Sequence, residues 1–393
     1  MQKFSSRSHG LDTLRSVAIL SVIGFHLWGY HGETVPDAML PLLRIGWMGV
    51  DLFFVLSGYL IATQLFRPYC EGRRLRVWEF YRNRLYRVLP AFLVVLGLYL
   101  LVPEWRETSA LAPAWQYATF TFNLLAEHPA SKSFSHAWSL CVEEHFYLFL
   151  PLIVLAAMRK PSARRAVTLV GGFVLLGIAA RGWFLFHTLR PLAGQDEFGT
   201  AFMRHIYYPT YSRLDGLLAG ASLAMLKMFR PGWWVQIARR GHMLLVLGVT
   251  MTGAAVLLFQ DRHPAAAGTS VGSVLFGFPL LAVGLACLVA SALSTNGWLR
   301  LKVPGAQLCA TLAYCVYLTQ KEMLHLVDSW FPTLEHAGRL PWAVVYLMVC
   351  FAAAGVLHVC VERPFLRLRD RARASTRAAE EAAPLDSGIE PAL

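Results

Sequence analysis

Long runs of apolar residues constrain this chain more than any other feature. We find ten runs, each close to the about 20 residues that a helix needs to cross the hydrocarbon core of a bilayer. They cover approximately residues 11–30, 46–66, 86–102, 136–158, 166–188, 207–229, 242–259, 271–293, 306–326 and 341–361. Only 15% of the residues are charged, against about 25% in soluble domains. The sequence therefore predicts an all-α, polytopic membrane protein with about ten transmembrane helices.

The net charge of +12 is unevenly distributed. Of the 36 Lys and Arg residues, 25 fall in one alternating set of loops and tails. By the positive-inside rule that side is cytoplasmic, which predicts two cytoplasmic termini in a multi-pass protein of the bacterial inner-membrane type. The basic charge then reflects topology rather than a nucleic-acid-binding face. The first apolar run has no A-x-A-like cleavage site and more spans follow it, so we expect it to be retained.

The domain organisation is simple. Residues 1–370 are predicted to form one transmembrane domain, and residues 371–393, rich in Ala, Glu, Ser and Pro, a disordered cytoplasmic tail. Segment 110–126 is apolar but short, which favours an interfacial or re-entrant helix. The seven cysteines show no metal-binding or redox spacing, so we predict no metal site.

Two ionisable residues lie in the first apolar run. Arg15 and His26 are eleven residues apart, so both project from one helix face, about 16 Å apart along the axis. A cation near one membrane surface and an imidazole deeper in the bilayer suggest a functional pair. The alternative is an arginine that snorkels to the interface and a histidine that packs or caps near the other end.

Asp51 begins the second span, on the same side of the membrane as His26. It could orient an imidazole or pair with an arginine such as Arg44, or simply lie at an interfacial helix start. Arg84 and Arg87, three residues apart, share a face at the cytoplasmic mouth of the third span. Paired arginines bind phosphates by forked hydrogen bonds. Anchoring by the positive-inside rule is the alternative.

The fourth span contains two adjacent acids, Glu143 and Glu144, which are costly to bury unless they are paired or protonated. Glu143 shares a face with Ser139 and Tyr147, and Glu144 points about 100° away. We interpret these acids as functional. His136 and Trp138 lie at the outer edge of this span, where a tryptophan is common.

Arg213 and Asp215 lie in the sixth span, two residues apart, so they point to different sides and need different partners. Asp51 and Glu143 are carboxylates that Arg213 could bind. A structural buried ion pair and a catalytic role are both consistent with this pattern. Gln320, Lys321 and Glu322 form a polar outer end of the ninth span.

Six stretches in this order resemble the acyltransferase-3 family of membrane O-acyltransferases. They cover about residues 10 to 370 and read LDTLR followed by His26, GVDLFFVLSGYLI, FYRNRLYRVLP, WSLCVEEHFY, SRLDGLLAG and VERPF. The first includes Asp12, which we count as a supporting residue together with His136, Trp138, Glu144, Arg213 and Asp215.

The resemblance implies transfer of an acyl group, often acetyl, from cytoplasmic acyl-CoA to a hydroxyl of a sugar or another acceptor, with no bound cofactor. Acceptors in the family include O-antigen, exopolysaccharide, peptidoglycan, Nod factors and macrolides. Some members carry a fused SGNH hydrolase-like domain. This chain contains none, so we expect the membrane domain or a separate partner to meet the acceptor.

Two positions depart from the family pattern. Gln320 stands where a histidine is common, and His145 replaces the glutamine that usually follows the paired acids. The first departure puts any role of that ninth-span position in question.

Our hypothesis is that Arg15, Arg84 and Arg87 hold the phosphates of acyl-CoA. His26, oriented by Asp51 or Glu143, then removes the proton of the acceptor hydroxyl. Imidazole suits this role because it exchanges protons near neutral pH. A covalent acyl-histidine relay is a variant.

The alternative function is a proton-coupled transporter of a small polar or anionic solute, since intramembrane Arg, Asp, Glu and His suit proton-coupled transport. The absence of an internal sequence repeat speaks against it. A structural subunit of a polysaccharide export complex would leave the buried charges unexplained.

Overall fold

The computed structural model describes residues 8–31, 37–125, 133–260, 270–332 and 339–382, and all of their regular secondary structure is helical. The long helices are α1 (His9–His31), α3 (Met48–Cys70), α4 (Val77–Leu101), α7 (Ala137–Met158), α8 (Ala163–Phe184), α10 (Asp215–Phe229), α12 (Gly241–Gln260), α13 (Phe278–Ala292), α14 (Ala306–Trp330), α15 (Arg339–Leu357) and α16 (Arg363–Ala382). Shorter helices are α2 (Leu40–Arg44), α5 (Ala114–Ala118), α6 (Phe122–Leu125), α9 (Glu197–Phe202) and α11 (Pro231–Ala238).

Short turns of other helix types interrupt or join these elements. The π-helical turns are Leu185–Leu189, Met203–Tyr207, Ser273–Gly277 and His358–Glu362. The 3₁₀ turns are Asp37–Met39, Pro103–Trp105, Arg190–Leu192, Thr210–Ser212 and Trp298–Arg300.

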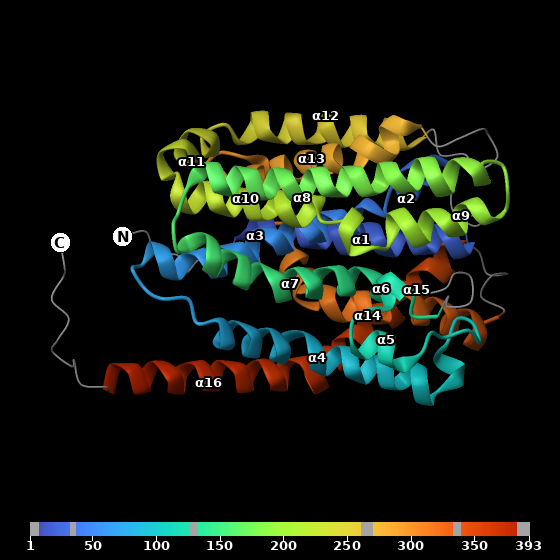
Figure 1. Cartoon of the computed structure of the whole chain (residues 1–393). Helices are drawn as coiled ribbons and strands as arrows, with labels where there is room; N and C mark the ends of the chain where they lie inside the picture. Colours follow the sequence, from blue (N-terminus) through green and yellow to red (C-terminus); the bar gives the residue numbers. More distant parts are fainter. Residues whose placement is uncertain (1–7, 32–36, 126–132, 261–269, 333–338, 383–393) are drawn as a thin grey trace, which may run out of the picture.

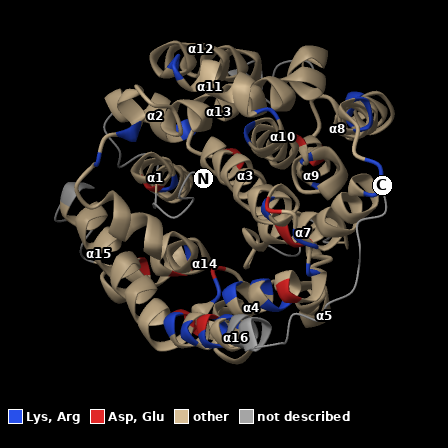
Figure 2. Cartoon of the chain, turned by 90° about the vertical axis from the view of Figure 1, so that its left-hand side faces the viewer, with Lys and Arg blue, Asp and Glu red and all other residues tan. Residues whose placement is uncertain are grey.

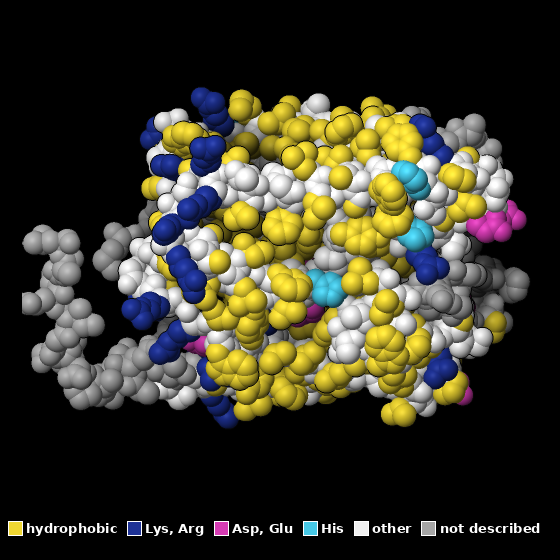
Figure 3. Space-filling model, viewed as in Figure 1, with side chains coloured by type: hydrophobic (Ala, Val, Ile, Leu, Met, Phe, Trp, Pro, Cys, Tyr) yellow, Lys and Arg dark blue, Asp and Glu magenta, His cyan; other side chains and the backbone are white. Residues whose placement is uncertain are grey.

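The long helices run side by side in one bundle, with α12 along one edge and α4 and α16 along the opposite edge (Figure 1). Helix α3 lies inside, and 72% of its span is buried, against 17% for α8 and α12. Exposed side chains across the middle of the bundle are mostly apolar, whereas Lys and Arg gather at one end (Figure 3). We call this end, where α1 begins and α16 ends, the basic end.

Eight helical stretches of the described residues are long and apolar enough to cross a membrane: His9–Tyr30, Met48–Cys70, Val77–Leu101, Ala137–Met158, Ala163–Leu192, Gly241–Phe259, Ser273–Ala292 and Pro341–Ser375. The all-α, polytopic membrane fold is therefore confirmed. The other two of the ten predicted spans correspond to α10, whose 15 residues are fewer than a spanning helix needs, and α14, which carries three consecutive polar residues.

The structure differs from the sequence prediction in two segments. The expected single helix within 110–126 is broken at Phe120, whose φ of 56° is left-handed, leaving the short helices α5 and α6. Residues 371–382, predicted to be disordered, continue α16 to Ala382. The remainder of the predicted tail, 383–393, lies outside the described residues.

Glycines bring α3 and α10 into backbone contact. A Cβ added at Gly58 of α3 would overlap the Leu217 carbonyl of α10, and one at Gly220 would overlap the Val55 carbonyl. Membrane helices associate closely through such small residues. This contact holds α3, which carries Asp51, against α10.

We expect Gly220→Leu to destabilise the bundle, since overpacking costs about 1–3 kcal/mol where the neighbours can relax and here the neighbour is backbone. The check is thermal unfolding of the detergent-purified protein, with Gly172→Leu as the control. Gly172 lies on α8 and has no atom within 4 Å of an added Cβ. Equal loss of stability in both variants would contradict the close-packing interpretation.

Candidate active site

His26 is hydrogen bonded to a side chain of α14. Its Nδ1 lies 2.9 Å from Oε1 of Gln320. The amide oxygen accepts this bond, so Nδ1–H donates and the Nε2 lone pair is left available. Near the basic end of the same helix pair, the Ser16 hydroxyl donates to the Ala306 carbonyl at 2.8 Å. These two bonds connect α1 to α14 and hold the imidazole in one orientation.

The expected orienting acids therefore do not serve His26. The sequence hypothesis names Asp51 or Glu143, whereas in the structure both carboxylates bind other groups. The partner is Gln320, the residue at which the chain departs from the family pattern. An amide can fix the tautomer of an imidazole as a carboxylate does, but it adds no negative charge to stabilise an imidazolium.

The residues after Gln320, predicted to form a polar outer end of the ninth span, are buried inside the bundle. Lys321 Nζ lies 3.1 Å from Glu107 Oε1 and donates to the Ser135 hydroxyl at 2.9 Å. Glu322 is fully buried, and one of its oxygens lies 3.8 Å from Nε2 of His136. Within the described part of the chain, neither oxygen of Glu322 has a hydrogen-bond partner.

This cluster has the spacing of a metal site. Ligand atoms of Glu107, His136 and Glu322 lie within 4.8 Å of one another. The Lys321 ammonium already supplies a positive charge beside Glu107. A divalent ion would be repelled by that ammonium, so the cluster is better described as a buried network of side chains.

Asp51 and Arg213 form a buried ion pair. Arg213 Nη2 donates to both carboxylate oxygens, at 2.9 and 3.0 Å. The guanidinium also lies over the rings of Trp138 and Phe278, at 5.4 and 4.0 Å from their centroids. Arg213 therefore binds one of the two carboxylates expected for it, and Asp51 binds Arg213 instead of His26 or Arg44.

Asp215 has a separate partner, as its spacing predicts. Arg181 of α8 is fully buried and donates through Nη1 and Nη2 to the two Asp215 oxygens at 2.6 and 3.3 Å. It also donates to the Ser212 carbonyl at 2.6 Å. These bonds join α8 to α10, which is a structural role.

A cavity of about 1110 Å³ opens at the basic end. Its walls come from α1, α3, α4, α7, α14 and α16. Figure 2 shows these helices grouped together in the end-on view, with α16 outermost beside α4. Among the described residues, nine arginines line it: Arg15, Arg67, Arg73, Arg74, Arg76, Arg84, Arg87, Arg369 and Arg373. Three acids in the same part of the chain, Glu79, Glu143 and Glu144, also line it. The cavity therefore has the size of a ligand site and a strongly positive mouth.

The predicted donor residues and the paired acids meet in this cavity. Arg84 lies 3.9 Å above the ring of Tyr147, and Tyr147 donates to Glu143 Oε2 at 2.5 Å. Tyr147 also binds the Ser57 hydroxyl, which must be the donor because the phenol has one hydrogen. A chain from Ser57 through Tyr147 to Glu143 therefore lines the cavity wall.

Arg87 also has a partner. It donates to the buried Glu362, at the end of the π-helical turn His358–Glu362, in an ion pair. Tyr314 of α14 lies beside it, with its ring centroid 5.9 Å from the guanidinium, and donates to the Val88 carbonyl at 2.8 Å. Arg87 thus joins the cavity wall to the C-terminal helices.

His26 is not among the described residues that line the cavity. Its inner wall includes Phe53 and Tyr317, whose rings meet edge to face at 6.4 Å. Tyr317 precedes Gln320 by one turn of α14. The partner of His26 therefore lies one helical turn beyond a residue of the cavity wall.

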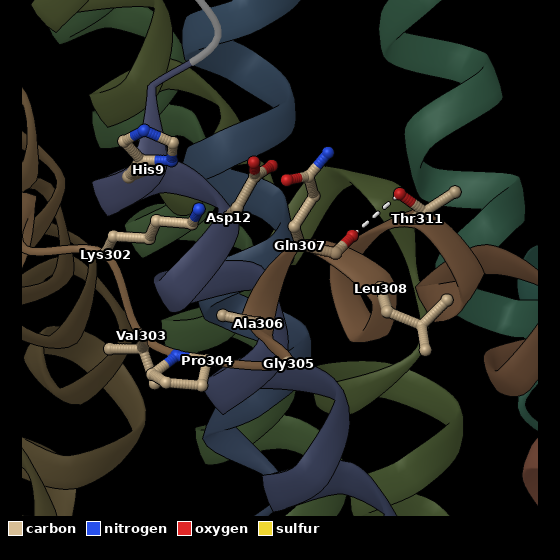
Figure 4. A pocket seen from close by; sticks show the side chains of 10 residues that line it. All are labelled: His9, Asp12, Lys302, Val303, Pro304, Gly305, Ala306, Gln307, Leu308 and Thr311. Carbon is tan, nitrogen blue, oxygen red and sulfur yellow. Dashed lines mark hydrogen bonds between the residues drawn. The ribbon is translucent and has the colours of Figure 1, made fainter.

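Arg15 lies at the cavity edge, with one third of its side chain exposed, and pairs with Asp12 at 3.7 Å. Asp12 also borders a second cavity of about 360 Å³ at the start of α14. Figure 4 shows His9, Lys302 and Gln307 around this hollow. Arg15 and His26 thus lie on one continuous helix, as predicted. Arg15 borders the large cavity, and His26 is bonded to Gln320.

Sequence reasoning missed three parts of this site. Glu107 lies in a loop with no helical period, so nothing marked it. Lys321 and Glu322 are buried, and the available sequence signal was a run of three polar residues, 320–322, inside an apolar span. Arg373 fell in the predicted disordered tail, and Arg369 lies two residues before that tail. Their spacing of four residues, typical of one helix face, was the available signal.

The sequence model described as "Acyltransferase domain", the acyltransferase-3 model, matches residues 8–359. The chain is 25% identical over 382 residues to "Putative O-acetyltransferase SACOL0978" of Staphylococcus aureus strain COL, covering 91% of this chain and 57% of that protein. It is 29% identical over 233 residues to "O-acetyltransferase OatA" of S. aureus strain NCTC 8325, covering 55% of this chain and 34% of that protein. It thus spans about half the length of the first of these curated relatives. No solved structure matches the chain.

We expect Asp51→Ala to reduce stability by about 3–5 kcal/mol, because it leaves the buried Arg213 charge without its carboxylate. Thermal unfolding in detergent is the measurement. The double variant Asp51→Leu/Arg213→Met, which removes both charges, should recover much of the loss. A stable Asp51→Ala variant that lacks only activity would contradict the structural role.

Proposed function

The chain belongs to the acyltransferase-3 family, and from this premise we propose that it is a membrane O-acyltransferase. It moves an acyl group, most simply acetyl, from acyl-CoA to a hydroxyl of a cell-envelope or exported glycan. The observation that carries the proposal is the arginine-lined cavity, whose walls include Arg84 and Arg87. Guanidinium groups bind phosphates by forked, charge-assisted hydrogen bonds, and CoA carries a pyrophosphate and a 3′-phosphate.

The proposed topology follows from charge. The basic end faces the cytoplasm under the positive-inside rule, so the cavity opens to the compartment that holds acyl-CoA. Both ends of the described chain lie at this basic end (Figure 1). The opposite end, with α5 and α6, then faces the acceptor.

In the proposed reaction, arginines at the mouth bind the CoA phosphates and the thioester arm extends inward past Tyr147 and Ser139. To reach His26, the arm must pass the contact between Phe53 and Tyr317. The imidazole then removes the proton of the acceptor hydroxyl through Nε2. The alkoxide oxygen attacks the thioester carbonyl, an ester C–O bond forms, the C–S bond breaks and CoA leaves as the thiolate.

Gln320 supports this use of His26. By accepting from Nδ1–H, it keeps the Nε2 lone pair available as the base. Arg15 adds positive charge at the cavity edge. Glu143, bonded to Tyr147, is proposed to hold the cavity wall and Arg84, and not to orient the imidazole.

We expect His26→Ala to lower acetyl transfer by about 10²–10⁴-fold, the usual contribution of a general base. The measurement is incorporation of radiolabelled acetyl from acetyl-CoA into cell-envelope glycan, in membranes with equal amounts of folded protein. His187→Ala, an exposed histidine on another part of the bundle, is the control. Transfer near the parent rate in His26→Ala would exclude the base role. Solute uptake without acetyl transfer by the parent would favour a transporter.

We expect Gln320→Leu to lower kcat by about 3–10-fold, the value of one hydrogen bond, with little change in KM for acetyl-CoA. The loss arises because the imidazole is no longer held with Nε2 free. Gln320→Glu, which keeps an acceptor oxygen, should retain more activity than Gln320→Leu in the same transfer assay. A purely structural Gln320 would give both variants the same kcat and a lowered unfolding temperature.

A further inference from the structure

Helix α16 returns along α4 at the edge of the bundle, toward the basic end (Figure 1). Five arginines have described side chains on it: Arg363, Arg367, Arg369, Arg371 and Arg373. Arg369 and Arg373 are half-buried and line the large cavity, whereas the other three are exposed and do not line it. The helix therefore contributes a selected pair of its arginines to the cavity.

The register of this pair is set at the start of the helix. Glu362, Leu366, Arg369 and Arg373 follow the spacing of one helical stripe. Glu362 is almost fully buried and anchors that stripe to two other elements. It accepts from Arg87 of α4 and from the Cys315 thiol of α14 at 3.3 Å, and within its own turn from His358 Nδ1 at 2.5 Å. These contacts hold the start of α16 in the register in which Arg369 and Arg373 line the cavity.

The π-helical turn His358–Glu362 makes this anchoring possible. It joins α15 to α16 and brings His358 and Glu362 into hydrogen-bond contact. Such turns are rare and frequently occur at functional sites. Here the turn lies where α15 continues into α16, whose arginines border the cavity.

Charge at the mouth indicates the ligand class. Arg73, Arg74 and Arg76, from the loop between α3 and α4, border the same cavity as Arg369 and Arg373. Arg369 also donates to Asp370, its exposed neighbour in sequence. Bringing several guanidinium groups together around one concavity is unfavourable in itself. A phosphate bound among them would offset this repulsion through charge-assisted hydrogen bonds.

We propose that α16 completes the donor site, and that Arg369 and Arg373 bind the 3′-phosphate of CoA. The inference deepens the proposed function and rests on it. With the thioester arm directed inward past Tyr147, the adenosine end of the donor remains at the mouth, where α16 lies. The C-terminal helix then selects CoA thioesters over acyl donors that lack a 3′-phosphate.

The experiment measures the affinities of CoA and 3′-dephospho-CoA for the full chain purified in detergent without anionic lipid. The test variant is Arg369→Gln/Arg373→Gln. The matched control is Arg367→Gln/Arg371→Gln, which removes the same charge from exposed positions of the same helix. Both variants must show the parent's thermal unfolding profile.

We expect the parent to bind CoA more tightly than 3′-dephospho-CoA. The test variant should lose about tenfold or more in CoA affinity, the value of losing hydrogen bonds to a charged group, and little in 3′-dephospho-CoA affinity. The control should match the parent. Equal CoA affinity in the test and control variants would overturn the proposal, as would an equal loss for both ligands.

A lipid phosphate is the other source of this chemistry, and a second arm distinguishes it. The same affinities are measured in nanodiscs of phosphatidylcholine and of phosphatidylglycerol. An effect of the test variant confined to phosphatidylglycerol would assign the two arginines to lipid headgroups and overturn the proposal. A parent chain that binds neither CoA nor 3′-dephospho-CoA would instead defeat the proposed function itself.

Discussion

The cost of burying an unpaired charge away from water organises the interior of this bundle. Arg213 with Asp51, and Arg181 with Asp215, are paired across helices that lie far apart in the sequence. Each pair fixes the orientation of two helices at once, because breaking it would strand a charge. The glycine contact between α3 and α10 brings Asp51 and Arg213 within reach of each other. Close packing and charge pairing therefore depend on one another in this half of the molecule.

The same constraint separates structural from reactive groups. Asp51 and Asp215 each accept hydrogen bonds from a buried arginine on both carboxylate oxygens. His26 makes one hydrogen bond through Nδ1 to a neutral amide, and this leaves Nε2 for chemistry. Glu322 is buried with both oxygens lacking a hydrogen bond within the described residues.

The proposed donor site is an assembly of distant segments. Arg84 and Arg87 come from α4, the Glu143–Tyr147 pair from α7, and Arg369 and Arg373 from α16. Glu362 links two of these segments through Arg87. The cavity forms only when these helices are packed together, because its arginines come from separate segments. Like charges at close range repel one another, so the packing must hold them there.

The sequence alone determined the class of fold and the position of most site residues. Apolar runs and the distribution of Lys and Arg follow from the physics of the bilayer, which acts on each segment independently. The partners of the buried groups depended on tertiary structure. Nothing local to Asp51 distinguishes Arg213 from His26 or Arg44, because that choice depends on how α3 docks against α10. Gln320 became the partner of His26 through the packing of α1 on α14. The placement of Arg369 and Arg373 beside the cavity was hidden for the same reason, because it depends on how α16 packs along α4.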